Sequence, residues 1–208
     1  MRVFAAVELP EELRARVAAA ARELLAGIRA AKPVAAENLH VTLRFVGDVP
    51  GRAAGEQAGA LAELCGAIGT ATASVAPSVA ELRGFGAFPN ARRPRIVWAG
   101  IDDPSGVLAA LEGAISSRLE GLGYVRESRP YSAHLTVARL REGARDLGPL
   151  SVRLADSQRE PPAFGGFPVK SVTVFDSELG RNGSRYTALA CFPLDPSMQR
   201  DGAAVPKE

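Results

Sequence analysis

Short stretches of alternating or continuous apolar residues along the 208-residue chain predict a series of β-strands. The stretch "LHVTLRFVG" has the two-residue period of a half-buried strand, and Gly47 and Asp48 end it as turn residues. The opening stretch "RVFAAVEL" is almost wholly apolar, which is typical of a buried strand. We expect strands at residues 2–9, 39–47, 95–101, 132–140, 169–179 and 184–194, an extended stretch at 71–82 and a hairpin turn at 180–183.

Three longer segments carry the composition and end signals of α-helices. Pro10 suits the first turn of a helix, where its missing N–H is not needed, so the Ala-rich run after it predicts a helix over 11–30. A second Ala-rich run predicts a helix over 53–69, and a third predicted helix, 104–123, ends on a glycine. The Gly-, Pro- and Asn-rich segment 85–94 is expected to be a loop.

The order of these elements repeats along the chain. A strand, a helix and a histidine-bearing strand occur in the first part, and the same succession returns in the second part. This order predicts one α+β domain over residues 1–194, built of two pseudo-symmetric lobes with outer helices. The two histidine-bearing strands are expected to face each other across a central cleft. Residues 195–208 are expected to form a disordered tail.

Composition narrows the class of protein without identifying it. Hydrophobic residues make up 47% and charged residues 23%, as in ordinary soluble domains, and a net charge of +2 is too small to indicate a protein that coats nucleic acid. Arginine supplies 22 of the 25 cations; its planar fork suits phosphate, but the coding bias of a GC-rich genome accounts for the same excess. The chain has no signal-peptide core and no apolar window near the ~18 residues of a membrane span. We therefore expect a soluble cytoplasmic protein with no membrane partner, and a monomer by default.

Both histidines of the chain lie in the same short motif. His40 and Thr42 stand in "NLHVTLRFVGDV", and His134 and Thr136 stand in "YSAHLTVARL", 94 residues later. The chain has six threonines, so two chance His-x-Thr matches are improbable. Residues i and i+2 of a strand point to the same face, with Cα atoms about 6.5–7 Å apart. Each strand therefore presents one imidazole and one hydroxyl to the same small region.

Two such pairs match the needs of in-line attack on a cyclic phosphate diester. One imidazole can act as base at the entering oxygen and the other as acid at the leaving oxygen, each worth roughly 10²–10⁴ in rate. The threonine hydroxyls can donate hydrogen bonds to the non-bridging oxygens. This chemistry requires neither a metal nor a cofactor.

The two histidines could instead serve a structural, metal-binding or triad role, and each role has its own requirements. A single histidine on an amphipathic strand is most often a hydrogen-bonded core or surface residue, and the repeated pattern counts against this structural role. A zinc site would need further ligands at suitable spacing, and Cys65 and Cys191 provide none. A serine hydrolase would need a Gly-x-Ser-x-Gly turn, which is absent from the sequence.

Together the two motifs resemble the paired signatures of the two-histidine (2H) phosphoesterases. The branch they resemble most is that of the bacterial and archaeal RNA 2′,3′-cyclic phosphodiesterases, also called 2′-5′ RNA ligases. Three further stretches resemble that branch's opening strand, middle loop and closing hairpin: "MRVFAAVELPEEL", "GFGAFPNARRPRIVWAGI" and "VKSVTVFDSELGRNGSRYTALACFPL". The resemblance covers most of residues 1–194 and implies an antiparallel sheet in each lobe.

The resemblance also implies a reaction. Water opens a 2′,3′-cyclic phosphate at an RNA end and leaves a 2′-phosphate, so the 3′ oxygen is the leaving group. By analogy, His40 protonates that oxygen and His134 takes a proton from water, while Thr42 and Thr136 hold the phosphate. Run in reverse, the same groups would join a 2′,3′-cyclic phosphate to a 5′-hydroxyl and give a 2′-5′ linkage.

Residues that would hold the base are suggested by position. Phe45 and Arg139 lie five residues past the two histidines, where the family places groups that flank the base. Residues an odd number of positions apart point to opposite faces of a regular strand, so a bulge would be needed to turn both side chains to the face of the histidines. For Phe45, packing in the core is the alternative. Arg44 shares the parity of His40 and could reach phosphate, or could be an exposed strand arginine. Phe88 is a second stacking candidate, or a loop anchor.

Two weaker candidates remain. Tyr131 stands three residues before His134 and either lines the cleft or serves the entry into the strand. Arg92, Arg93 and Arg95 form a basic cluster that either guides RNA or is simply solvated.

Two alternatives to an RNA-end hydrolase remain open. The same chemistry could act on a small cyclic nucleotide, such as an ADP-ribose cyclic phosphate. The chain could also be a non-catalytic RNA- or nucleotide-binding module, although it retains all four motif residues.

Overall fold

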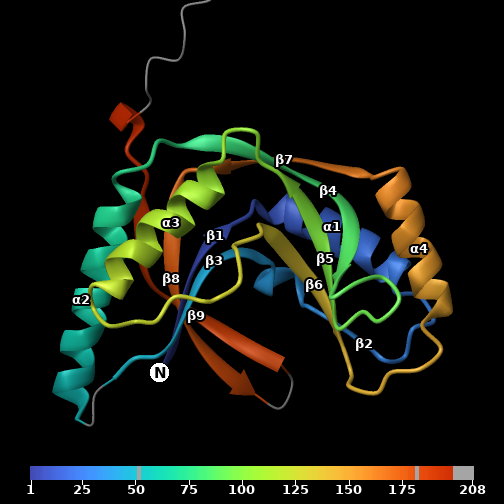
Figure 1. The fold of residues 1–208 in the computed structure, drawn as a ribbon, viewed down its shortest axis with the longest axis horizontal. Coiled ribbons are helices and arrows are strands. Elements are labelled where there is room, and N and C mark those ends of the chain that lie inside the picture. The colour runs from blue at the N-terminus through green and yellow to red at the C-terminus, as the bar shows by residue number, and fades with distance from the viewer. Residues whose placement is uncertain (51–52, 181–182, 199–208) are drawn as a thin grey trace, which may run out of the picture.

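A computed structural model describes residues 1–50, 53–180 and 183–198 (Figure 1). Nine strands and four α-helices lie within these ranges. The strands are β1 (Arg2–Glu8), β2 (Ala31–Pro33), β3 (His40–Asp48), β4 (Ser78–Phe88), β5 (Ile96–Asp102), β6 (His134–Leu140), β7 (Ala163–Val169), β8 (Ser171–Gly180) and β9 (Gly183–Pro193). The helices are α1 (Glu11–Leu24), α2 (Ala54–Thr72), α3 (Val107–Glu120) and α4 (Gly148–Arg159).

The strands form one curled antiparallel sheet with two matching halves. Its order is β7-β4-β5-β6-β3-β1-β8-β9, and β2 pairs with β6 beside this path. Each half contains four strands in which a β-α-β unit repeats: β1-α1-β3 in the first half and β5-α3-β6 in the second. The α+β class and the antiparallel pairing are therefore confirmed. The two halves differ from separate lobes in one respect, because the β3–β6 pairing joins them edge to edge into a continuous sheet.

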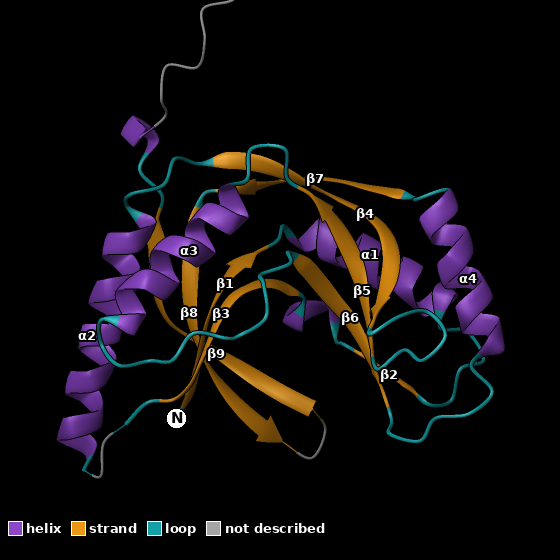
Figure 2. Cartoon of the chain, viewed as in Figure 1, coloured by secondary structure: helices purple, strands orange, loops and turns teal. Residues whose placement is uncertain are grey.

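The helices of the two units cover opposite halves. Helix α1 connects strands of the first half, but it contacts β6, β7 and α4 of the second. Helix α3 connects strands of the second half, but it contacts β3 and lies beside α2, which contacts β8 and β9. Figure 2 shows these two pairs of helices at opposite ends of the molecule. Each half is therefore completed by a helix from the other.

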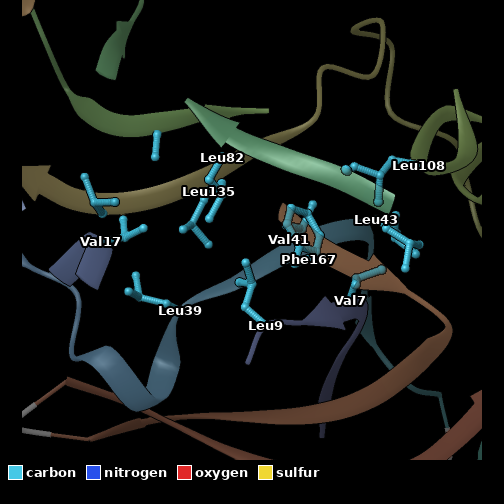
Figure 3. Packing of buried hydrophobic residues seen from close by; sticks show 14 of the residues in the cluster. Val7, Leu9, Val17, Leu39, Val41, Leu43, Leu82, Leu108, Leu135 and Phe167 are labelled. Carbon is cyan, nitrogen blue, oxygen red and sulfur yellow. The ribbon is translucent and has the colours of Figure 1, made fainter. Parts of the chain in front are cut away.

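One face of the sheet carries the main core. Alternate residues of the central strands point to it, including Val41 and Leu135, both 0% exposed. Figure 3 shows side chains from β1, β3, β4, β6 and β7 gathered in this layer. The opposite face of the first half carries a smaller cluster of Phe4, Ala6 and Phe175. Side chains of β1 therefore point alternately into the main core and into the smaller cluster, so nearly every residue of this strand is apolar.

Several element boundaries differ from the sequence predictions. The predicted helix 11–30 ends at Leu24, because Gly27 adopts a left-handed φ of 80° and residues 31–33 then pair with β6. The predicted loop 85–94 is wrong in its first part, since β4 continues through Phe88. Helix α4 and strand β7 lie in segments for which the sequence predicted no element.

The ends of two predictions fall outside the described residues. Strands β8 and β9 pair as a hairpin: Ser171 lies opposite Pro193 at one end, and Gly180 lies opposite Gly183 at the other. Residues 181–182 of the predicted turn are not described. The part of the predicted tail at 199–208 is likewise outside the described residues. Residues Pro196–Met198 form a 3-10 turn, and Leu194 just before it is buried. No helix in the described part of the chain is long and apolar enough to cross a membrane.

Candidate active site

The two His-x-Thr motifs lie side by side at the centre of the sheet. His40 begins β3 and His134 begins β6, and these antiparallel strands pair through Val41 and Leu135. Antiparallel register about this pair sets His40 opposite Thr136 and Thr42 opposite His134. The two histidine strands are therefore direct neighbours in one curled sheet, and do not come from two separate sheets.

All four motif side chains project from the same face. Thr42 pairs with Ala6, a member of the smaller apolar cluster, while Val41 pairs with Val7 of the main core. On the other side, Thr136 and His134 pair with Trp98 and Gly100. Cross-strand partners share a face, so two imidazoles and two hydroxyls converge on the face away from the main core.

Matching bulges shape both strands just past the motifs. In β3 the register shifts between Ala6–Thr42 and Ala5–Arg44, which leaves Leu43 as the extra residue. In β6 the register shifts between Trp98–Thr136 and Val97–Ala138, which leaves Val137 as the extra residue. A bulge reverses the parity of the residues after it. The two strands accordingly share the same burial pattern over their first seven residues.

These bulges bring Phe45 and Arg139 to the histidine face. Phe45 pairs with Phe4, their ring centroids lie 5.9 Å apart, and 54% of its surface is exposed. Arg139 pairs with Ile96 and is exposed. The ring and the guanidinium therefore flank the four motif residues from equivalent positions in the two halves.

Each histidine is oriented by a backbone carbonyl two residues earlier. Nδ1 of His40 lies 2.8 Å from the oxygen of Asn38, and Nδ1 of His134 lies 2.8 Å from the oxygen of Ser132. A carbonyl oxygen only accepts hydrogen bonds, so we assign the proton of each neutral ring to Nδ1. Nε2 is then free in both rings to accept a proton or, when protonated, to donate one.

Aromatic rings enclose His40. Phe4 stacks on it with centroids 4.8 Å apart, and Tyr186 meets it edge-on at 5.2 Å. Burial among these rings lowers the pKa of His40 below its ordinary value. The hydrogen bond with Asn38 raises this pKa, the positive charge of Arg139 lowers it, and the Glu8 carboxylate raises it.

Phe88 and Trp98 form the corresponding wall beside His134. Phe88 meets the imidazole edge-on at 5.1 Å, and its centroid lies 5.4 Å from that of Trp98. The indole lies over Gly86, where an added Cβ would stand 2.2 Å from the ring. A glycine at this point of β4 is therefore what allows Trp98 to lie flat beside the site.

Comparisons with known proteins agree with this geometry. The profile of the family "LigT like Phosphoesterase" matches residues 7–98. An RNA 2′,3′-cyclic phosphodiesterase of Archaeoglobus fulgidus is 33% identical over 192 residues, which cover 92% of this chain and 99% of the relative. Another of that name, from Thermus thermophilus, is 35% identical and covers 100% of this chain and 98% of the relative.

The chain belongs to the LigT-like phosphoesterases.

Solved structures of LigT-like proteins share the fold. A crystal structure of a Thermus thermophilus protein matches with a TM-score of 0.73 at 30% identity, over 93% of this chain and 97% of that one. The structure of Escherichia coli LigT complexed with 3′-AMP matches with a TM-score of 0.68 at 27% identity, over the same shares. The resemblance drawn from the two His-x-Thr motifs is thereby confirmed.

Arg44 of this LigT-like phosphoesterase does not lie with the other candidates. It follows the Leu43 bulge, so it pairs with Ala5 on the main-core face and is only 3% exposed. Its guanidinium donates to the carbonyl oxygen of Val125. The expectation that Arg44 shares the face of His40 is wrong, because strand parity holds only up to the bulge.

The weaker candidates lie at the margins of the site. The Tyr131 hydroxyl donates to the carbonyl oxygen of Thr42 at 3.3 Å, and the ring packs on the main core. Burial, and then the charges of Glu112 and Asp103, raise the pKa of Tyr131 well above its ordinary value, so it remains a neutral donor. It therefore braces β3 against the segment that leads into β6.

The predicted basic cluster is divided among different contacts. Arg95 forms an exposed ion pair with Glu142 at 2.8 Å. The backbone N–H groups of Arg92 and Arg93 donate to Asn90 Oδ1, and this turn fixes the loop after β4. The Arg95 guanidinium is thus paired with Glu142, and the side chains of all three arginines are exposed.

Sequence analysis missed the part that Trp98 plays in the LigT-like site. Trp98 is the single tryptophan of the chain and stands on the strand before the second motif. Its indole Nε1 is buried without a hydrogen-bond partner among the described residues. The rarity of the residue was a signal, but its contact with Gly86 depends on long-range pairing. Among the described residues, no group of three or more His, Cys, Asp or Glu could hold a metal ion.

Proposed function

We propose that this LigT-like phosphoesterase hydrolyses the 2′,3′-cyclic phosphate at RNA ends to a 2′-phosphate, without a metal ion. The observation that carries the proposal is the convergence of two carbonyl-anchored histidines and two threonines on one face, repeated by two equivalent bulged strands. The relatives named RNA 2′,3′-cyclic phosphodiesterase support the substrate class. A cytoplasmic setting is part of the same proposal.

The proposed reaction is an in-line displacement at phosphorus. Nε2 of His134 takes a proton from water as the water oxygen bonds to phosphorus. The bond between phosphorus and the 3′ oxygen breaks, and Nε2 of His40 delivers a proton to that oxygen. The product keeps the phosphate on the 2′ oxygen. Each proton transfer by a positioned group contributes roughly 10²–10⁴ in rate.

Substrate binding supplies the protonated form that His40 needs as an acid. Burial disfavours the imidazolium in the free protein, because the charged form loses solvation. A phosphate anion placed beside the ring offsets that loss and favours the imidazolium. Protonation of His40 is therefore coupled to occupation of the site, because burial in the empty site favours the neutral ring.

The remaining side chains would bind and orient the substrate. The hydroxyls of Thr42 and Thr136 are placed to donate to the non-bridging oxygens, where charge must be held during transfer. Phe45, Arg139 and Phe88 offer a ring, a guanidinium and a ring for stacking against the base. Microscopic reversibility extends the proposal to 2′-5′ joining of a cyclic phosphate to a 5′-hydroxyl.

The test is product analysis with matched variants. The purified protein is mixed with EDTA and a short RNA that ends in a 2′,3′-cyclic phosphate; a 2′-phosphate product is expected. His40→Asn and His134→Asn keep a donor near the Nδ1 position but lack Nε2, so each is expected to lose at least about 100-fold in rate with the fold intact. Thr42→Val and Thr136→Val are expected to lose less than the asparagine variants but about 10-fold or more, since each removes one hydrogen bond to a charged phosphate oxygen.

Each result bears on a different part of the proposal. A 3′-phosphate product would reverse the leaving group and exchange the roles of His40 and His134. Near-parent activity in either asparagine variant would sink the acid–base pair. Loss of activity in EDTA with recovery in zinc would overturn the metal-free mechanism. Binding without turnover would favour a non-catalytic module.

A second candidate substrate is a small cyclic nucleotide. Structures of Escherichia coli LigT complexed with 3′-AMP, NADP+ and ATP give this candidate specific support. The chemistry would be the same, and the two substrates differ in what lies beyond the terminal nucleotide. A higher kcat/KM for the mononucleotide than for an RNA oligomer would favour this second candidate.

A further inference from the structure

A row of cations leads away from the candidate active site along the short strand β2. Lys32 of β2 and Arg139 of β6 are direct cross-strand partners, and both are exposed. Cross-strand partners project from the same face, so Lys32 stands beside Arg139 on the histidine face. Like charges directly opposite each other destabilise a sheet. An anion laid over the pair would turn this repulsion into attraction.

The row continues past the end of β6 into a hollow. The backbone N–H of Arg141 donates to the oxygen of Ala30 at 3.0 Å, which extends the β2–β6 pairing. The guanidinium of Arg141 donates to the oxygen of Arg29 at 2.8 Å, which fixes it at the rim. Residues 27–30 and 141–146 line an open hollow of about 520 Å³. Figure 1 shows the loop after β6 running beside β2 in this region.

The charge of the hollow is positive. Arg29, Arg141 and Arg145 line it, together with Glu142 and Asp146. Glu142 forms an ion pair with Arg95, and both of these side chains are exposed. The lining therefore carries three guanidinium groups, one paired carboxylate and one carboxylate, Asp146, for which no partner is described. The planar guanidinium of arginine suits phosphate oxygens in particular.

We propose that Lys32, Arg29, Arg141 and Arg145, here named the cationic row, bind the sugar-phosphate backbone of a single-stranded RNA whose cyclic end lies at the two histidines. This inference rests on the proposed function and adds a second binding surface to it. His134 and Arg141 are seven residues apart, about 23 Å along an extended strand, which exceeds the reach of one nucleotide. A polymer with a phosphate at every nucleotide can occupy both ends at once.

Backbone contacts of this kind carry no base information. They would raise affinity for any strand with a cyclic phosphate end and would weaken as salt increases. The row therefore discriminates by length, so that an oligomer is preferred to a mononucleotide with the same reactive end.

The test compares a double variant, Lys32→Gln with Arg145→Gln, to the parent protein. Both side chains are exposed, and neither has a hydrogen bond or ion pair among the described contacts, so the fold is expected to persist. The matched control is Arg118→Gln, an exposed arginine on α3, which covers the other half. Fluorescence anisotropy measures Kd over a range of ionic strength for a labelled RNA hexamer ending in a 3′-phosphate, which the proposed reaction cannot consume.

The double variant is expected to bind the hexamer about fivefold or more weakly at moderate salt. The slope of log Kd against log salt is expected to fall by about 0.7 for each cation removed. Hydrolysis of 2′,3′-cyclic AMP by Arg145→Gln alone, which leaves Lys32 and Arg139 in place, and hexamer binding by the control are expected to match the parent. An unchanged hexamer Kd and slope in the double variant would overturn the inference. Failure of the parent to hydrolyse any cyclic phosphate would instead refute the proposed function. The anisotropy measurement would still show whether the cationic row binds RNA.

Discussion

Glu8 lies directly opposite His40 in the β1–β3 pairing, whereas Gly100 holds the equivalent place opposite His134. The two halves thus repeat each other in backbone but not in charge. The hydroxyl of Thr173 donates to the Glu8 carboxylate at 2.8 Å and holds it in place. A nearby negative charge favours the imidazolium of His40, but burial outweighs it and keeps the pKa of this ring below its ordinary value.

Substitutions on either side of His40 should move its pKa in opposite directions. Glu8→Gln removes a negative charge and is expected to lower the pKa further below the ordinary value of 6.5. Arg139→Gln removes a positive charge and is expected to raise it. NMR titration of the two imidazoles measures both shifts, and His134→Asn assigns the signals. Shifts of the same sign in the two variants would contradict this electrostatic account.

The lowered pKa of His40 should also make stability depend on pH. The unfolded chain binds the proton at an ordinary pKa of 6.5 and the folded protein binds it less readily, so protons favour unfolding. This contribution is fully present above pH 6.5 and is lost as the pH falls through 6.5 toward the lowered value. Urea unfolding above and below that pH should therefore show a larger loss in the parent than in His40→Asn. An equal loss in both proteins would show that His40 is not the group responsible.

Gly86→Ala should disturb the site without touching either motif. The new Cβ would stand 2.2 Å from the Trp98 ring, so the indole must move, and Phe88, which contacts the indole, also contacts His134. Overpacking of this kind costs about 1–3 kcal/mol in the free energy of unfolding, and kcat should fall with it. The control is Gly113→Ala inside α3, where nothing lies within 4 Å of the added Cβ. There, stability is expected to rise by about 0.5–1 kcal/mol with activity unchanged.

Arg44→Met should reduce stability and leave KM unchanged. The substitution removes the hydrogen bond from the charged guanidinium to the Val125 carbonyl oxygen, a type of bond worth about 1.5–3 kcal/mol. Because Arg44 faces the main core, no substrate contact is lost. Thermal unfolding and steady-state kinetics measure the two effects. A large rise in KM with unchanged stability would restore Arg44 to the phosphate site.

The sequence was sufficient to predict the motif residues because their geometry is local. His40 with Thr42, and His134 with Thr136, share a face through the two-residue period of a strand alone. The same period misplaced Arg44, because the bulge at Leu43 arises from pairing with β1 and leaves no mark in a single stretch of sequence.

Elements stabilised mainly by distant partners were the ones missed. Strand β7, "AFGGFPV", contains two glycines and a proline and has little strand propensity of its own, yet it pairs along β4. Helix α4 buries only Leu150 and Leu154 and so lacks a long apolar stripe. Strand β2 has three residues and exists through its pairing with the edge of β6.

The exchange of helices between the halves has a consequence for the order in which the chain is synthesised. Helix α1 emerges from the ribosome early and can contact the 3-10 turn Ala36–Asn38, but its other partners β6, β7 and α4 lie at residues 134–169. Strand β1 likewise gains its second neighbour only when β8, at residues 171–180, has been made. Neither half can close its core during translation of its own residues, so folding is completed only when nearly the whole chain is available. Contacts this distant in sequence also make folding slow compared with a helical domain of similar size.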